Sequence, residues 1–264
     1  SGGRTESVIV YIPTNGGGDY TGDDAARELA EFLNVSGYGD LHTPVVLIHT
    51  YSRDVANDPA FYRAIDKATG VWFAGGLPQR SYHAYLGTET EKALERLLRR
   101  NGVIGGTSAG ALMQSNIMLR ADRGGNHIVL GNPFIGFAFG DMMNIVIDVH
   151  NLHRNRAHDM LEALDVYPEL LGINVDEDTA VVMKGDEIRT VGTGWVQIFD
   201  PTLWQDETDT PFCANFLLSR GVGRYLIPGH GKSFFLGENT VYNVHTREVT
   251  SALVQTEEEL AKEL

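Results

Sequence analysis

The 264-residue sequence has a single cysteine, Cys213, and no apolar run of eighteen residues. A lone thiol excludes an internal disulfide and a cysteine-based structural zinc site, and its apolar surroundings, "PFCANF", predict a buried thiol. Without a long apolar run, no membrane-spanning helix is expected. The first residues, "SGGRTES", lack the apolar segment of a signal peptide. The compartment stays open: cytoplasmic, or secreted if a signal peptide has been removed.

Positive charge is also scarce. Lysine and arginine number 21 against 35 aspartates and glutamates, which leaves a formal net charge of −14. A protein that binds nucleic acid needs a basic surface to neutralise phosphates, so we expect no nucleic-acid partner and no membrane partner. The acidic residues are spread along the chain, which is typical of a solubilising surface. The charge is compatible with a basic or zwitterionic substrate.

Apolar strand-like segments alternate with helical patterns through the first half of the chain. Strands are predicted over 7–13, 45–51 and 70–76 and from Val103, with helices over 23–33, 60–68 and 89–100. Short apolar strands separated by helices indicate an α/β fold, a three-layer sandwich with a largely parallel central sheet. Further on we predict a helix over 150–164, a strand over 172–176, an antiparallel hairpin turning at Gly185-Asp186, and a short tail helix over 256–264. No linker interrupts the pattern, so residues 1–264 are predicted to form one domain.

Two glycine-rich segments and one histidine cluster could suggest a cofactor. "NGGGDYTG" (15–22) and "IPGHGKS" (227–233) each lack a glycine that a nucleotide-binding loop requires, because Thr21 and Leu226 take those places. Both are predicted to be tight turns. His150, His153 and His158 do not have the spacing of a zinc-binding helix. We therefore predict no metal and no organic cofactor.

"GTSAG", residues 106–110, fits the G-x-S-x-G nucleophile elbow, and it has a strand before it and a helix after it. A nucleophilic serine must stand clear of the sheet on a strained turn, and the residues two positions before and after it must lack side chains to avoid collision. The amide of Ala109 would then point at the reacting carbonyl from a helix N-terminus. The alternative is a Gly-Ser turn of purely structural use. Context and spacing favour Ser108 as a nucleophile.

A nucleophilic serine needs a base, and the base needs an acid to orient it. His150 ends the strand-like run "NIVIDVH", where a side chain reaches the edge of the sheet at which α/β sites form. Taken alone, it could also be an ordinary polar residue at a strand end. Asp176, Glu177 and Asp178 follow another strand, and spacing cannot choose among them. A second oxyanion donor is expected from Gly75 and Gly76, after the strand predicted to adjoin Val103-Ile104.

Together these segments resemble peptidase family S51, the cyanophycinase-like serine peptidases. Four motifs occur in the family's order: "AGGLPQR" (74–80), "IGGTSAG" (104–110), "DVHNLHRNR" (148–156) and "GINVDEDTA" (172–180). The resemblance implies a fold related to class I glutamine amidotransferases, and a triad of Ser108, His150 and Glu177. It implies an oxyanion hole made by the amides of Gly76 and Ala109. For substrate binding it implies Gln79, Asp148, Arg154 and Arg156.

The same resemblance implies hydrolysis of β-aspartyl peptides, and three departures bear on the substrate. Val149 stands for a family glutamine, Asp159 for a third arginine, and Leu77-Pro78 displaces Gln79. A lost donor and a reversed charge should change which charged group is bound. Cyanophycin-like, isoaspartyl and α-aspartyl peptides all stay open as substrates, and a homodimer is compatible with the family. The rival hypotheses are a binding protein without turnover and an esterase; the Ser-His-Glu order disfavours the esterase.

Overall fold

The computed structural model describes residues 7–18, 45–125, 127–131, 135–156, 159–201, 223–226, 232–236 and 240–251. The helices predicted over 23–33 and 256–264, and the cysteine at 213, lie outside these residues. The chain divides into two compact units, residues 1–143 and 144–264. The single domain expected from the sequence stays a prediction.

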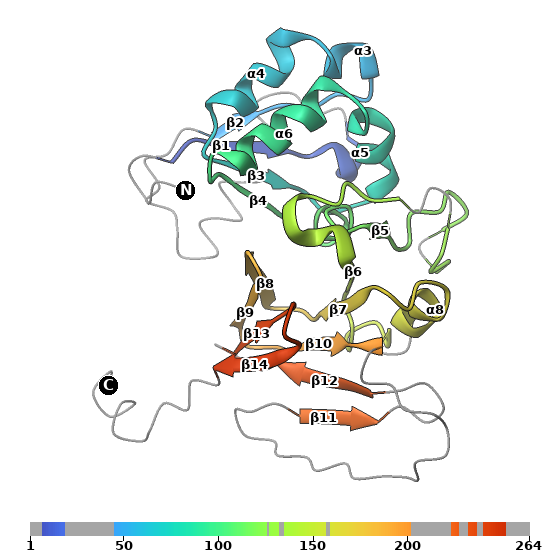
Figure 1. Ribbon diagram of the computed structural model, residues 1–264. Coiled ribbons are helices and arrows are strands. Elements are labelled where there is room, and N and C mark those ends of the chain that lie inside the picture. Colours follow the sequence, from blue (N-terminus) through green and yellow to red (C-terminus); the bar gives the residue numbers. More distant parts are fainter. Residues whose placement is uncertain are drawn as a thin grey trace. The chain divides into compact units, whose positions relative to one another are not determined.

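A parallel sheet forms the centre of the first unit, as predicted (Figure 1). Its strands are β1 (Ile9–Ile12), β2 (Val45–Leu47), β3 (Gly70–Phe73) and β4 (Val103–Gly106), in the order β2-β1-β3-β4. Each neighbouring pair runs parallel. The expected adjacency of the third and fourth strands is confirmed, because Val71 pairs with Ile104. The loops that follow β3 and β4 therefore leave the same edge of the sheet.

Helices follow the strands at the predicted places, together with several that the sequence did not indicate. Those of the first unit are η1 (Thr14–Gly16), α3 (Arg53–Ala56), α4 (Pro59–Lys67), α5 (Pro78–Tyr85), α6 (Glu89–Arg99) and α7 (Ala109–Leu112), with a short strand β5 (Ile117–Met118) after them. The side chain of Asp58 caps α4, and Pro59 occupies its first turn, where no amide donor is needed. The start of α4 is thus set by local chemistry. α3 and α5 are too short and too polar to show a clear periodicity.

The two faces of this sheet carry different apolar clusters. Val10 and Ile12 of β1 and Phe73 of β3 belong to the main core, which includes Ile65 of α4 and Leu94 of α6. On the opposite face Tyr11 packs with side chains of β2 and β3. This alternation is what strand geometry requires, since successive side chains point to opposite faces.

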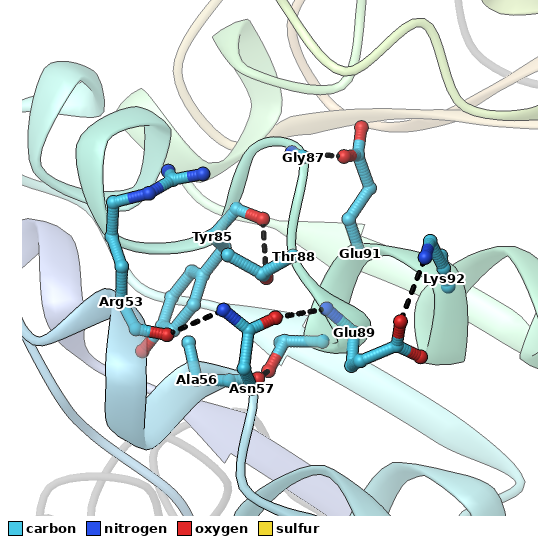
Figure 2. A network of polar contacts seen from close by, with 10 residues as sticks. Arg53, Ala56, Asn57, Tyr85, Gly87, Thr88, Glu89, Glu91 and Lys92 are labelled. Carbon is cyan, nitrogen blue, oxygen red and sulfur yellow. Dashed lines mark hydrogen bonds and ion pairs between the residues drawn. The ribbon is translucent and has the colours of Figure 1, made fainter.

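Polar contacts join the helices above the main core (Figure 2). The side-chain amide of Asn57 donates to the carbonyl of Arg53 at 2.9 Å, and its oxygen accepts the amide of Glu89 at 2.9 Å. Thr90 donates to the carbonyl of Ala56 at 2.6 Å. One exposed asparagine therefore links the end of α3 to the start of α6.

The second unit is mainly antiparallel. Five of its strands lie side by side in the order β11 (Gly223–Leu226), β12 (Lys232–Leu236), β10 (Val196–Phe199), β7 (Leu171–Val175) and β6 (Ile145–Val149). Of these neighbouring pairs, β6 and β7 run parallel and the others antiparallel. A separate sheet has the order β14 (Glu248–Ser251), β13 (Val241–Asn243), β9 (Glu187–Gly192) and β8 (Thr179–Lys184). Helix α8 (Asp159–Val166) follows β6. The short helix η2 (Gly140–Asn144), which begins in the first unit, directly precedes β6 along the chain. The molecule is a mixed α/β protein.

The hairpin predicted at Gly185-Asp186 is confirmed. Strands β8 and β9 pair antiparallel with Lys184 opposite Glu187. Gly185 has φ +56, and a Cβ added to it would have no atom within 4 Å. A two-residue turn of this kind needs positive φ, which is why glycine suits it.

The helix predicted over 150–164 is wrong in its first half. Residues 151–155 form turns, and α8 begins at Asp159. His150 (φ +60) and Asn155 (φ +52) have left-handed backbone conformations that a right-handed helix cannot include. Leu152, an apolar residue within the predicted helix, is 47% exposed. The segment is a loop that leaves β6. Within the described residues, no helix is both long and apolar enough to cross a bilayer.

Candidate active site

Ser108 stands at the corner between β4 and α7. Its backbone has φ 54 and ψ −114, a combination that residues with a side chain rarely adopt, and it is the N-cap of the helix. Its carbonyl accepts the amides of Ala111 and Leu112 at 2.9 and 3.1 Å. Backbone strain of this kind costs about 1–3 kcal/mol and persists where the surroundings hold it in place. The hydroxyl-bearing residue is therefore held in a fixed, unfavourable conformation, as a nucleophile elbow requires.

The two glycines of the elbow are required by close backbone packing. A Cβ on Gly106 would lie 2.4 Å from the carbonyl carbon and oxygen of Gly110. A Cβ on Gly110 would lie 2.3 Å from the carbonyl oxygen of Phe73, at the end of β3. That carbonyl also accepts the amide of Thr107 at 3.0 Å. The turn around Ser108 is thus packed against the end of the neighbouring strand.

The loop after β3 lies beside the elbow. A Cβ on Gly75 would lie 3.4 Å from the Cβ of Ser108 and 4.0 Å from its Oγ. Gly76 is exposed and has φ +129, a conformation that favours glycine. Ala109 opens α7, and the amides in the first turn of a helix have no acceptor within it. The structure therefore brings the Gly75-Gly76 loop and the start of α7 together around Ser108, all within the first unit.

In the second unit, His150 is hydrogen-bonded to Glu177. The residue follows β6 directly, and its Nδ1 lies 2.5 Å from Oε1 of Glu177, which follows β7. β6 and β7 are parallel neighbours, so both residues leave the same edge of the sheet. The hydrogen bond from the imidazole lowers the pKa of Glu177, as do the charges of His150, His153 and Arg154, whereas partial burial opposes them. The carboxylate is thus kept ionised beside the imidazole.

The structure separates the three acidic residues that spacing left equivalent. Glu177 bonds to His150, whereas Oδ1 of Asp176 accepts the amide of Leu152 at 3.3 Å. Asp178 takes φ 51, and its carbonyl accepts the amide of Thr193 at 3.0 Å. Of the three carboxylates, that of Glu177 meets the ring of His150 and that of Asp176 bonds to the neighbouring loop, whereas Asp178 bonds through its backbone carbonyl.

A buried network of amide side chains lies next to His150. Asn151 donates to Oε1 of Gln197 at 2.8 Å and accepts from the amide of Asn174 at 3.2 Å. Asn174 pairs in register with Gln197 on β10 and with Asp148 on β6. All these side chains are at most 1% exposed. The network ties the loop that carries His150 to two strands of the sheet.

Asp148 and Arg156, expected to bind substrate, are buried together. Nη1 of Arg156 lies 3.8 Å from Oδ1 of Asp148 and donates to the carbonyl of Val149 at 3.1 Å. Their side chains are 0% and 9% exposed. These contacts close the turn on both sides of His150. Arg154, by contrast, is exposed. The predicted role of these residues in binding substrate stays a prediction.

Gln79, also expected to bind substrate, lies in α5 and is 8% exposed. Among the described residues its Oε1 has no hydrogen-bond partner. Burying an amide oxygen without a hydrogen-bond partner costs free energy, so an atom of this kind is a candidate to bind a ligand or a water. Gln79 therefore offers an acceptor close to the loop of Gly75 and Gly76.

Sequence reasoning missed two polar groups of the first unit. Asn15, in η1, is fully buried. Thr14 beside it has its Oγ1 at 2.5 Å from the hydroxyl of Tyr85 and 3.0 Å from Nδ1 of His49. The sequence signal that could have revealed these residues is their position just after a buried parallel strand.

Three or more metal-ligating side chains do not cluster anywhere in the described part of the chain. His158 lies outside it.

The chain is similar to known peptidases of one family. Residues 3–191 match the model of peptidase family S51. A cyanophycinase of Geminocystis herdmanii is 27% identical over 241 residues, which cover 88% of this chain and 84% of that protein. A cyanophycinase of Synechococcus elongatus is 28% identical over 193 residues, covering 70% of this chain and 56% of that protein.

A solved structure supports the fold. A peptidase from an acI-B1 Actinobacterium superposes with a TM-score of 0.54 at 23% identity, over 74% of this chain and 78% of its own. The family match extends from before β1 to β9, across both units, and it includes all four motifs of the sequence. The chain therefore belongs to peptidase family S51, and it is a serine peptidase.

Proposed function

We propose that Ser108, His150 and Glu177 form the catalytic triad of this peptidase and that it cleaves amide bonds through an acyl-enzyme. The observation that carries the proposal is the hydrogen bond between Nδ1 of His150 and Glu177. A base whose one ring nitrogen is held by a carboxylate acts through the other, Nε2. The strained conformation of Ser108 provides independent support.

The reaction follows from these roles. Oγ of Ser108 attacks the carbonyl carbon while its proton passes to Nε2 of His150. The C–N bond breaks as the imidazolium returns that proton to the leaving amine, which leaves an ester on Ser108. Water then attacks the ester, with its proton taken by His150, and the ester bond to Oγ breaks to restore the hydroxyl. Glu177 stabilises the imidazolium in both halves.

The proposed oxyanion hole consists of the amides of Gly76 and Ala109. Their positions beside Ser108 support this role, because one belongs to the adjoining loop and the other opens α7. A donor of this kind is worth about 3 kcal/mol of barrier, since it acts on charge that develops in the transition state. No step of the proposed mechanism uses a metal or a cofactor.

The proposed substrates are aspartyl peptides, most closely the β-aspartyl type. The cyanophycinases among the relatives support this class. Because Asp148 and Arg156 pair with each other, we assign substrate carboxylate binding to Arg154, which is exposed near Glu177. With Asp159 in place of a third arginine, one cation fewer is available to bind the carboxylates of the substrate. We therefore expect the aspartyl carboxylate held by Arg154, and not the partner residue, to dominate recognition.

Two measurements test the proposal. A fluorophosphonate probe should label Ser108, and Ser108→Ala and His150→Ala should each abolish labelling and peptide hydrolysis. Ser52→Ala is the matched control, because that serine caps α3, and its loss should leave activity unchanged. Absence of an adduct on wild-type Ser108 would contradict the mechanism.

A panel of α- and β-linked Asp dipeptides with Arg, Lys or Leu partners, read by mass spectrometry, tests the substrate class. Cleavage of β-linked peptides irrespective of the partner is expected. Cleavage of α-linked peptides alone would overturn the assignment.

A further inference from the structure

Asn15 contacts three separate elements around the loop of Gly75 and Gly76. Its Nδ2 donates to the carbonyl of Ala74 at 3.0 Å and lies 3.4 Å from Sδ of Met113, just after α7. Its Oδ1 accepts the amide of Ser81 in α5 at 3.4 Å. The side chain is fully buried, so each of these bonds is protected from water.

The backbone carbonyl of Asn15 holds the other end of the same loop. It accepts the amide of Leu77 at 2.9 Å and Nη1 of Arg80 at 2.7 Å. A Cβ on Gly76 would lie 2.1 Å from this oxygen, so Gly76 is packed directly on it. One residue therefore fixes the loop before Gly76, at Ala74, and after it, at Leu77.

We propose that Asn15 is a positioning residue, which holds the Ala74–Leu77 loop so that the amide of Gly76 stays beside Ser108. The inference rests on the proposed function, because it assigns a purpose to the oxyanion donor. It adds a residue from η1, outside the four motifs on which the family resemblance stands.

The loop needs such a residue because Gly75 and Gly76 follow one another in it. A Gly-Gly loop has wide access to backbone conformations, so an isolated loop of this kind would not hold an amide in one direction. Oxyanion stabilisation depends on donors that are in place before charge develops. A misplacement of about 1 Å can cost about 100-fold in rate. Asn15 removes that freedom from both sides of Gly76.

The test compares Asn15→Asp with wild type. The aspartate keeps an acceptor for Ser81 but places a second oxygen against the carbonyl of Ala74. We expect the rate of fluorophosphonate inactivation, kinact, to fall about 10- to 100-fold, with the apparent affinity KI little changed, because the phosphoryl oxygen needs the donor chiefly in the transition state. Asn15→Ser, which keeps a small donor, should lose less.

Asn57→Asp is the matched control. Asn57 makes the same kinds of bond, from its side-chain amide to a carbonyl and from a backbone amide to its oxygen, at an exposed place among α3, α4 and α6 (Figure 2). Its substitution should lower the melting temperature slightly and leave kinact unchanged. A general loss of stability therefore cannot imitate the expected result.

The outcomes separate the two proposals. If wild type is not labelled at Ser108, the proposed function fails. If wild type is labelled and a folded Asn15→Asp protein reacts at the same rate, the positioning role alone is overturned. Should neither Asn15 variant show a cooperative thermal transition, Arg80→Met carries the test, because it removes a donor from the carbonyl of Asn15 at a half-buried position. An unchanged kinact in that variant would then refute the role.

Discussion

Replacing Gly106 by alanine should destabilise the protein strongly although it adds a single methyl group. The new Cβ would lie 2.4 Å from two backbone atoms of Gly110 and 2.9 Å from its Cα, against 3.4–4 Å for ordinary contact. The overlap is therefore about 1 Å, and backbone atoms cannot rotate away as a side chain does. Gly106 does not have positive φ, so steric contact is the whole effect.

Overpacking of this kind costs about 1–3 kcal/mol, and the rigid neighbours place Gly106→Ala at the upper end, about 3 kcal/mol. For a chain of this size, that corresponds to a fall in Tm of about 6–12 °C. The assay is thermal denaturation followed by circular dichroism, with urea unfolding to give the free energy. Labelling of Ser108 should fall as well, because relief of the overlap must move the elbow.

Gly75→Ala provides the comparison at the adjoining loop. Its Cβ would lie 3.4 Å from Cβ of Ser108 and from the carbonyl of Thr107, which is ordinary contact. Its Tm should therefore stay within about 2 °C of wild type. Equal melting temperatures for Gly106→Ala and Gly75→Ala would refute the steric reasoning.

Further predictions concern two ionisable groups, Glu177 and Tyr85. Glu177→Gln should lower kcat/KM at neutral pH about 5- to 30-fold, because a charge-assisted hydrogen bond is lost at a partly exposed site. The lowered pKa of Glu177 means that its hydrogen bond with His150 stabilises the fold above about pH 4.5, and that this contribution is lost as pH falls through the folded-state pKa of the carboxyl. After discounting for solvent, the contribution is at most about 1 kcal/mol. The stability difference between wild type and Glu177→Gln, measured by urea unfolding, should therefore vanish near pH 3, and a constant difference would contradict the pairing. Burial raises the pKa of Tyr85 to about 12, so stability should fall as pH rises from 10 to 12, by about 3 kcal/mol in all. Tyr85→Phe should lack this alkaline loss, and an identical pH profile would argue against burial of the hydroxyl.

Several elements could be predicted because their signals are local. The strands of the parallel sheet are short and apolar, and α4 and α6 have clear periodicity or caps, so each appears where the pattern placed it. The helix expected from His150 onward failed because apolar spacing does not reveal a left-handed backbone. Leu152 is apolar and lies within that predicted helix, but the loop leaves it exposed.

In the candidate site, too, the residues with local sequence signals could be predicted and the others could not. Ser108 could be found because the residues two positions before and after it must be glycines for steric reasons. A requirement of this kind is visible in a short stretch of sequence. The choice of Glu177 over Asp176 and Asp178 required the resemblance, and the hydrogen bond to His150 appears in the structure. For Asp148 and Arg156 the role in binding substrate stays a prediction. Their burial and their mutual contact depend on how the loop folds back, which the sequence does not indicate.

The sequence by itself determined the order of strands and helices, the elbow that carries Ser108 and the membership of a peptidase family, because these depend on neighbours along the chain. The tertiary structure supplied the contact between Glu177 and His150, and it alone revealed that Asn15 binds both ends of the Gly75-Gly76 loop. Contacts of that kind join residues dozens of positions apart. Their partners are chosen by strand register and helix packing, which no single stretch of sequence contains.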